Sequence, residues 1–182
     1  MGMNIMKITV SGHPGSGTST LVEGLVKHYN LNSINGGQIF RDEAKKANLS
    51  LADFGELCES NEEIDKNLDK LLKRHIKGDV FAIIESRLAG WWAYKLNIDS
   101  IRIWLDVEEK ERAKRVVKRE GKTIFQAMEE NSKRLTVDNA RYQKMYGIIP
   151  EDHEPYTNII KATGMDAEQV INHTIKIIEG EI

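Results

Sequence analysis

Short apolar runs alternate with longer stretches of helical periodicity along this chain. Continuous apolar runs are typical of strands buried on both faces of a parallel sheet, whereas apolar positions three or four apart indicate amphipathic helices. The predicted strands cover residues 8–10, 31–34, 80–84, 101–106 and 158–161. The predicted helices cover residues 21–29, 38–47, 51–60, 62–77, 108–120, 123–146 and 166–178.

The order of these elements predicts an α/β fold with a mostly parallel sheet and right-handed crossovers. We expect three layers with a central five-stranded sheet in a single domain. Two helical stretches, about 38–77 and 108–146, contain no predicted strand and are interpreted as insertions above the carboxyl edge of the sheet. Ligands bind at that edge in open parallel sheets, so we expect the functional site there.

Composition excludes several classes of function. The 182 residues, 40% hydrophobic and 30% charged, suit one domain with a well-filled core. The net charge of -2 produces no overall field that would attract nucleic acid or an anionic membrane. No apolar run is long enough for a secretory signal or a membrane span, and Cys58 is the only cysteine. We therefore expect a cytoplasmic protein without disulfides and without nucleic-acid or membrane partners.

A glycine-rich loop, defined as residues 12–20, separates the first predicted strand from the first predicted helix. Glycines let consecutive backbone N–H groups wrap phosphate oxygens, and a following helix N-terminus favours negative charge. We interpret the loop as an ATP-binding loop consisting of Gly12, His13, Pro14, Gly15, Ser16, Gly17, Thr18, Ser19 and Thr20.

One position departs from the usual phosphate-binding pattern. Thr18 stands where G-x-x-x-x-G-K-[ST] has lysine. A hydroxyl of Ser19 or Thr20 would complete the shell of a Mg²⁺ ion bound with ATP. The alternative is an ordinary tight turn in which Thr18, Ser19 or Thr20 caps the helix.

Two segments resemble the archaeal-type cytidylate kinases. The hydroxyl residues 18–20 match the variant loop of that family, and residues 87–91 (Arg-Leu-Ala-Gly-Trp) match a second segment, with Ser86 where the family usually has glycine. The resemblance covers nearly the whole chain. It implies a P-loop kinase fold that binds ATP with Mg²⁺ and phosphorylates CMP and dCMP.

The resemblance also implies a division of the single domain. The core would comprise about residues 6–35, 78–118 and 140–182, and the acceptor-binding region about residues 36–77. A lid would cover about residues 119–139, with Gly121 as a hinge.

Basic residues dominate residues 110–122, where Arg112, Arg115 and Arg119 share one helical stripe. Such a run is most often a solvated face. The resemblance implies instead that Arg115 and Arg119 fold over the triphosphate. Because the transition state of phosphoryl transfer is a dispersed negative charge, positioned cations do most of the catalysis.

A second charged set follows, in which Arg134, Asp138 and Arg141 share a helix face. Alone it indicates a surface ladder of ion pairs, but cytidylate kinases carry a similar pattern, with an aspartate where this chain has Leu135. The resulting hypothesis is that Mg²⁺ and four catalytic arginines replace the missing lysine, namely Arg115, Arg119, Arg134 and Arg141.

The acceptor side is predicted mainly from the resemblance. It implies that Arg41 and Arg87 bind the acceptor together with Asp138, and a guanidinium suits a phosphate dianion well. We expect Trp91 and Trp92 to be core residues rather than platforms for a base. We interpret Asp65 and Asp69, which alternate with lysines, as part of a solvated helix face.

Two alternatives remain open at this point. One is another small-acceptor kinase, acting on AMP, UMP or a sugar. The other is a non-catalytic nucleotide-binding switch, although the arginine sets favour an enzyme. The five histidines show no metal-ligand spacing, so Mg²⁺ bound with ATP is the one cofactor expected, and we expect a monomer.

Overall fold

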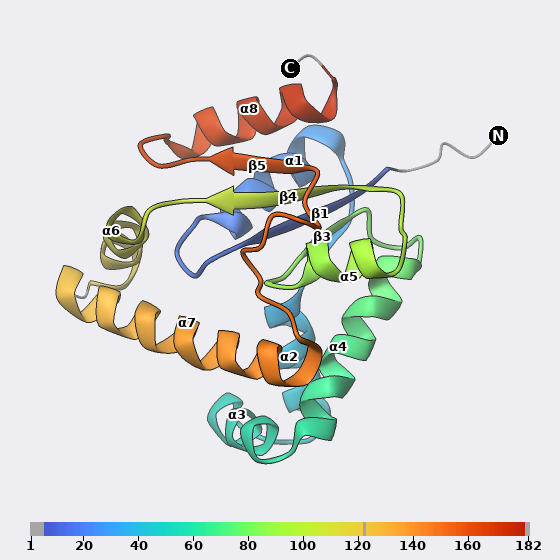
Figure 1. The fold of residues 1–182 in the computed structure, drawn as a ribbon, viewed down its shortest axis with the longest axis vertical. Coiled ribbons are helices and arrows are strands. Elements are labelled where there is room, and N and C mark those ends of the chain that lie inside the picture. Colours follow the sequence, from blue (N-terminus) through green and yellow to red (C-terminus); the bar gives the residue numbers. More distant parts are fainter. Residues whose placement is uncertain (1–5, 122, 181–182) are drawn as a thin grey trace.

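A five-stranded parallel sheet forms the centre of the computed structural model, which describes residues 6–121 and 123–180, except for the side chains of 51–52 and 118–120 (Figure 1). The strand order is β2-β3-β1-β4-β5. Their bounds are Lys7–Gly12 for β1, Ser33–Asn35 for β2, Ile83–Glu85 for β3, Ser100–Asp106 for β4 and Asn158–Lys161 for β5. The predicted five-stranded parallel sheet is confirmed.

Helices surround this sheet on both faces. Their bounds are Thr18–Tyr29 for α1, Gly36–Lys46 for α2, Leu51–Ser60 for α3, Glu62–Lys77 for α4, Ala89–Lys95 for α5, Glu109–Glu120 for α6, Ile124–Tyr146 for α7 and Ala167–Ile178 for α8. No helix over the described residues has both the length and the apolar character to cross a membrane.

Side chains that alternate along the strands fill two separate cores. Ile83 and Ile103 belong to the core under α1 and α8, whereas their neighbours Ile84 and Trp104 belong to the core under α4 and α5. Successive strand residues point to opposite faces, so an unbroken apolar run supplies both cores. Figure 1 shows α5 on one side of the sheet and α1 on the other, which gives the predicted three layers.

Two local predictions were wrong. The strand predicted at 80–84 begins only at Ile83, because Val80 lies in the preceding loop with 69% of its surface exposed. Helix α5 was not predicted, since five of its seven residues are buried and leave no polar stripe to mark a helical period.

The strand register gathers the carboxyl ends of three strands at one edge. Val10 of β1 lies level with Glu85 of β3, which in turn lies level with Asn35 of β2. The glycine-rich loop leaves β1 at this edge (Figure 1), and residues of α2, α3, α4 and α7 line a cavity there. The predicted place of the two helical insertions therefore agrees with the structure.

Candidate active site

A cavity of about 910 Å³ lies at the carboxyl edge of the sheet. Its size suits a pair of small ligands or one extended ligand. It brings together most of the predicted site residues, namely Gly12, His13, Pro14, Gly15, Thr18, Ser19, Arg41, Arg87, Arg134, Asp138 and Arg141. Ser16, Gly17, Thr20 and Arg115 do not line it, and the side chain of Arg119 lies outside the described residues.

The glycine-rich loop leaves the N-terminus of α1 without a side-chain cap. Gly15 and Gly17 adopt left-handed φ values of 83° and 91°, and Gly17 is the N-cap residue. The alternative in which Thr18, Ser19 or Thr20 caps α1 is wrong, because no side chain accepts a hydrogen bond from its first amides. By contrast, side chains cap α2, α3, α4, α7 and α8. Free amides and the helix dipole suit an anionic ligand.

Two hydroxyl groups of α1 meet a carboxylate from β3. Thr18 Oγ1 and Ser19 Oγ both donate to Glu85 Oε1, at 2.7 and 2.8 Å. Glu85 is 8% exposed and lines the cavity. Sequence reasoning gave Glu85 no role, although its place at the carboxyl end of a strand was a usable signal.

Two arginines of α6 bind the backbone of the glycine-rich loop. Arg112 is 5% exposed and donates from Nη1 to the Pro14 carbonyl at 3.2 Å. Arg115 donates to the Ser16 carbonyl at 2.7 Å and also to carbonyls before α8, those of Ala162 and Met165. These two side chains are therefore not part of a solvated stripe, and they hold the loop against α6.

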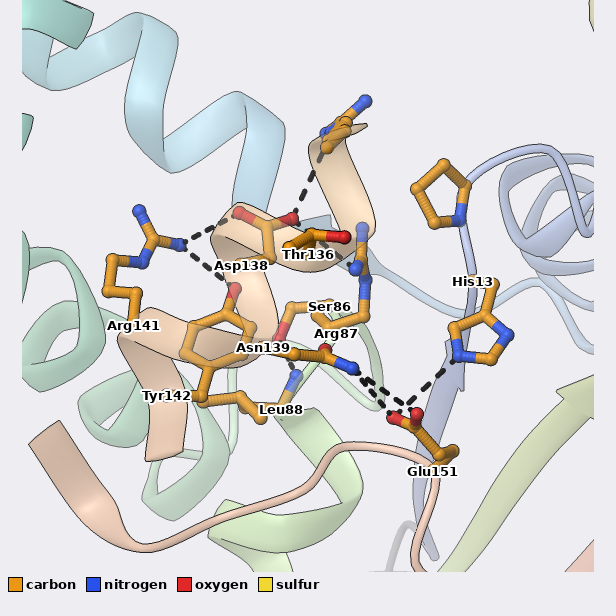
Figure 2. A network of polar contacts seen from close by, with 12 residues as sticks. His13, Ser86, Arg87, Leu88, Thr136, Asp138, Asn139, Arg141, Tyr142 and Glu151 are labelled. Carbon is orange, nitrogen blue, oxygen red and sulfur yellow. Dashed lines mark hydrogen bonds and ion pairs between the residues drawn. The ribbon is translucent and has the colours of Figure 1, made fainter. Parts of the chain in front are cut away.

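Three arginines surround the carboxylate of Asp138. Arg87 Nη1 lies 3.3 Å away, Arg141 Nη2 3.5 Å and Arg134 Nε 3.9 Å. We call Arg87, Arg134 and Arg141 the arginine cluster. Figure 2 shows Arg87 and Arg141 reaching Asp138 from opposite sides. The cluster carries three positive charges against two carboxylates, those of Asp138 and Asp65, so its net charge is positive and its potential favours an anion in the cavity.

Arg87 is the most enclosed of the three. Its side chain is 11% exposed, and its buried Nη1 makes no hydrogen bond. Burial lowers the pKa of Arg87, and Asp138 opposes that effect. The contact of Nη1 with Asp138 is an ion pair without a hydrogen bond, so the N–H groups of this atom remain suited to a ligand oxygen.

The turn that carries Arg87 is fixed by serine side chains. Ser11 Oγ donates to the Ser86 carbonyl at 2.8 Å, and Ser86 Oγ accepts from the Leu88 amide at 3.3 Å. The serine that replaces the family's glycine therefore has a structural role. On α2, the Asn35 side chain caps the helix that carries Arg41, whose guanidinium donates to Gln38 at 3.0 Å.

The solvated face predicted for Asp65 and Asp69 is wrong. Asp65 is 8% exposed, and its carboxylate lies 3.3 Å from Arg141 Nε. Asp69 accepts hydrogen bonds from the Tyr146 hydroxyl at 2.6 Å and from Trp92 Nε1 at 3.4 Å. Burial raises the pKa of both carboxyl groups, although the charge of Arg141 opposes the shift. Helix α7 covers this face of α4, and the local sequence around Asp65 and Asp69 does not indicate that contact.

The two tryptophans of α5 are core residues, as expected. Trp91 is 6% exposed and Trp92 4%. The Trp91 indole N–H donates to the Ile149 carbonyl at 3.0 Å, and neither ring lines the cavity.

We expect Asp69→Ala to lower the free energy of unfolding by about 1–3 kcal/mol, because it leaves the Tyr146 hydroxyl and the Trp92 N–H without their acceptor. At this chain length, each 1 kcal/mol corresponds to a fall of about 2–4 °C in Tm. Thermal unfolding measures the change. Glu63→Ala on the same helix is the control, since that side chain is 72% exposed. Equal Tm values for the two variants would show that the hydrogen bonds of Asp69 with Tyr146 and Trp92 do not stabilise the fold.

Three comparisons with known proteins extend this picture. A family model described as an AAA domain matches residues 11–134. A cytidylate kinase of Halobacterium salinarum is 42% identical over 81% of this chain and 76% of its own length. A cytidylate kinase of Archaeoglobus fulgidus is 32% identical over 96% of this chain and 95% of its own length.

Solved structures support the same fold at low sequence identity. An uncharacterized protein from Eubacterium ventriosum has a TM-score of 0.73 at 18% identity, covering 96% of this chain and 98% of its own. The shikimate kinase of Acinetobacter baumannii has a TM-score of 0.62 at 11% identity, covering 98% and 95%. Such distant neighbours establish the fold alone. The archaeal relatives, which match over most of both chains, show that this chain belongs to the cytidylate kinase family.

Proposed function

We propose that this protein transfers the γ-phosphate of ATP to CMP, giving ADP and CDP, and that dCMP is also an acceptor. One observation carries the proposal. The uncapped N-terminus of α1 and Arg87 Nη1, which is ion-paired with Asp138 but makes no hydrogen bond, belong to residues that line the same cavity, so an anion site for a donor adjoins one for an acceptor. The name of the cytidylate kinase relatives supplies the identity of the acceptor nucleotide.

On the donor side, the backbone amides of the glycine-rich loop bind the triphosphate. Arg112 and Arg115 act as positioning residues, because their hydrogen bonds go to carbonyls of the loop. Arg119, which follows Arg115 one turn later on α6, is proposed to reach the triphosphate. The proposed donor site is therefore an amide cradle that Arg112 and Arg115 hold against α6.

The oxygen ligands beside the loop fit a magnesium ion. Ser19 and Glu85 offer a hydroxyl and a carboxylate, which are ligands that Mg²⁺ accepts, whereas Thr20 does not line the cavity. We propose that Ser19 and Glu85 hold the ion that arrives with ATP. Bound there, Mg²⁺ would neutralise charge on the phosphates. Within the described residues, no group of three His, Cys, Asp or Glu side chains could hold a metal by itself.

On the acceptor side, we propose that Arg87 and Arg41 bind the phosphate of CMP. An acceptor phosphate oxygen attacks the γ-phosphorus as the bond to the bridging oxygen of ADP breaks. Arg134 and Arg141 lie beside this position and stabilise the dispersed charge. Asp138 keeps the arginine cluster in register and contacts the acceptor.

Several further features belong to the same proposal. We propose the division into core, acceptor-binding region and lid with the bounds given from the sequence, which makes α7 a continuous helix from the lid into the core. Gly121 ends α6 in a left-handed conformation with no atom near the position of a Cβ, which suits a hinge. We propose that the protein acts as a cytoplasmic monomer.

A coupled assay of ADP formation with CMP, dCMP, UMP and AMP tests the proposed function. We expect turnover with CMP and dCMP that exceeds turnover with UMP or AMP at least tenfold, and loss of turnover when EDTA removes Mg²⁺. Faster turnover with AMP or UMP would identify a different acceptor. Nucleotide binding without transfer to any monophosphate would indicate a non-catalytic switch.

A further inference from the structure

His13 occupies an unusual position for a titratable group, because it lies within the glycine-rich loop itself. Its side chain is 16% exposed, and its ring meets Trp104 edge-on at a centroid distance of 5.0 Å. Its Nε2 atom is buried and makes no hydrogen bond. The nearest carboxylate is that of Glu151, whose Oε2 lies 3.7 Å away, which is too far for a hydrogen bond.

Glu151 connects this histidine to α7. It lies in the segment between α7 and β5, and its carboxylate accepts from Asn139 Nδ2 at 3.2 and 3.5 Å. Asn139 follows Asp138, which holds the arginine cluster. Figure 2 shows the resulting row of His13, Glu151 and Asn139, with Asp138 and Arg87 beside it. Glu151 thus connects the glycine-rich loop to α7, the helix that carries Arg134 and Arg141.

The charges that face His13 come from three elements. Arg112 on α6 and Arg87 after β3 disfavour the imidazolium, and Glu151 favours it. Burial is the largest influence, and the net effect is a pKa below the usual range for histidine. Without a ligand, the ring is therefore neutral at pH 7. A triphosphate bound to the loop brings several negative charges next to the ring. These charges favour the imidazolium and raise the pKa of His13.

We propose that His13 is a positioning residue that takes up a proton from solvent when a nucleotide polyphosphate binds the loop, and then donates a hydrogen bond to Glu151. This inference rests on the proposed function, because it requires the loop to bind ATP. The new bond draws the loop and Glu151 together, and through Asn139 it fixes α7 in the register that the arginine cluster needs. Donor binding would in this way prepare the acceptor side.

Calorimetry of nucleotide binding tests the proposal directly. A non-hydrolysable ATP analogue with Mg²⁺ is titrated at pH 7 in buffers of different ionisation enthalpy, and the dependence of the heat on the buffer gives the number of protons taken up. We expect net uptake by the unmodified protein, none by His13→Asn, and reduced uptake by Glu151→Gln. His28→Asn is the control, since His28 lies on α1 outside the cavity and contacts Glu179. Binding of the ATP analogue to His28→Asn should be accompanied by the same proton uptake as binding to the unmodified protein.

The pH dependence of affinity gives a second readout. Because binding raises the pKa of His13, affinity is highest below the pKa of the free protein and falls as pH rises toward the pKa of the complex, by up to about tenfold per pH unit. His13→Gln should flatten this profile while Tm reports that the variant is folded. Binding without proton uptake, or proton uptake that persists in both His13 variants, would overturn the role of His13 and leave the proposed function standing. Absence of any binding would overturn the proposed function as well.

Discussion

Replacing Arg87 with alanine is expected to lower kcat/KM for CMP by a factor of about 10²–10³. The guanidinium is buried and lines the cavity, and its Nη1 lies 3.3 Å from the Asp138 carboxylate as an ion pair without making a hydrogen bond. A charge-assisted hydrogen bond in such an enclosed place is stronger than one at the surface. Steady-state kinetics with CMP as the varied substrate measures the loss.

Three controls separate a ligand role from a folding defect. Arg74→Ala removes an exposed arginine that does not line the cavity, and it should leave kcat/KM within about twofold. Arg87→Lys keeps the charge but loses the planar fork, so it should recover only part of the activity. Affinity for ATP should change little in either Arg87 variant, since the donor amides lie in the glycine-rich loop. A folded Arg87→Ala protein with kcat/KM within fivefold of the unmodified protein would refute the assignment.

Gly15→Ala is expected to raise the Kd for ATP by a factor of about 10² or more, because it combines two unfavourable effects. The φ of 83° costs an alanine about 1–2 kcal/mol. In addition, its Cβ would lie 2.9 Å from the Arg112 carbonyl, which is part of the α6 backbone and cannot turn aside. Since Arg112 also binds the Pro14 carbonyl, the loop and α6 cannot separate without losing that bond. Fluorescent-nucleotide titration measures the change.

Gly180→Ala isolates the backbone effect. Gly180 has a φ of 70° and no atom within 4 Å of the position of a Cβ, so its replacement adds strain without a collision. We expect a small fall in Tm and an unchanged Kd for ATP. If Gly15→Ala also bound ATP normally, the amide cradle would not depend on the close approach of the loop to α6.

Local patterns were sufficient to predict most elements of the fold. The helices at 51–60 and 62–77 and the strand at 158–161 have the predicted bounds in the structure. Ser50 and Asn61 cap the two helices with their own side chains, so the signals that start them lie within a few residues. The same holds for the strand, loop and helix around the glycine-rich loop, because glycine spacing and a β-branched run are properties of adjacent positions.

The sequence by itself determined a parallel α/β sheet, a glycine-rich loop at its carboxyl edge and a set of arginines gathered near that edge. The tertiary structure decided which charged groups are buried and what they contact. Asp65 and Asp69 look solvated in the sequence because lysines flank them, yet α7 covers them. The partners of Thr18 and Arg115 likewise come from β3 and from the loop, 67 and 99 residues away. Burial depends on which distant segment packs against a helix face, and no local pattern contains that information.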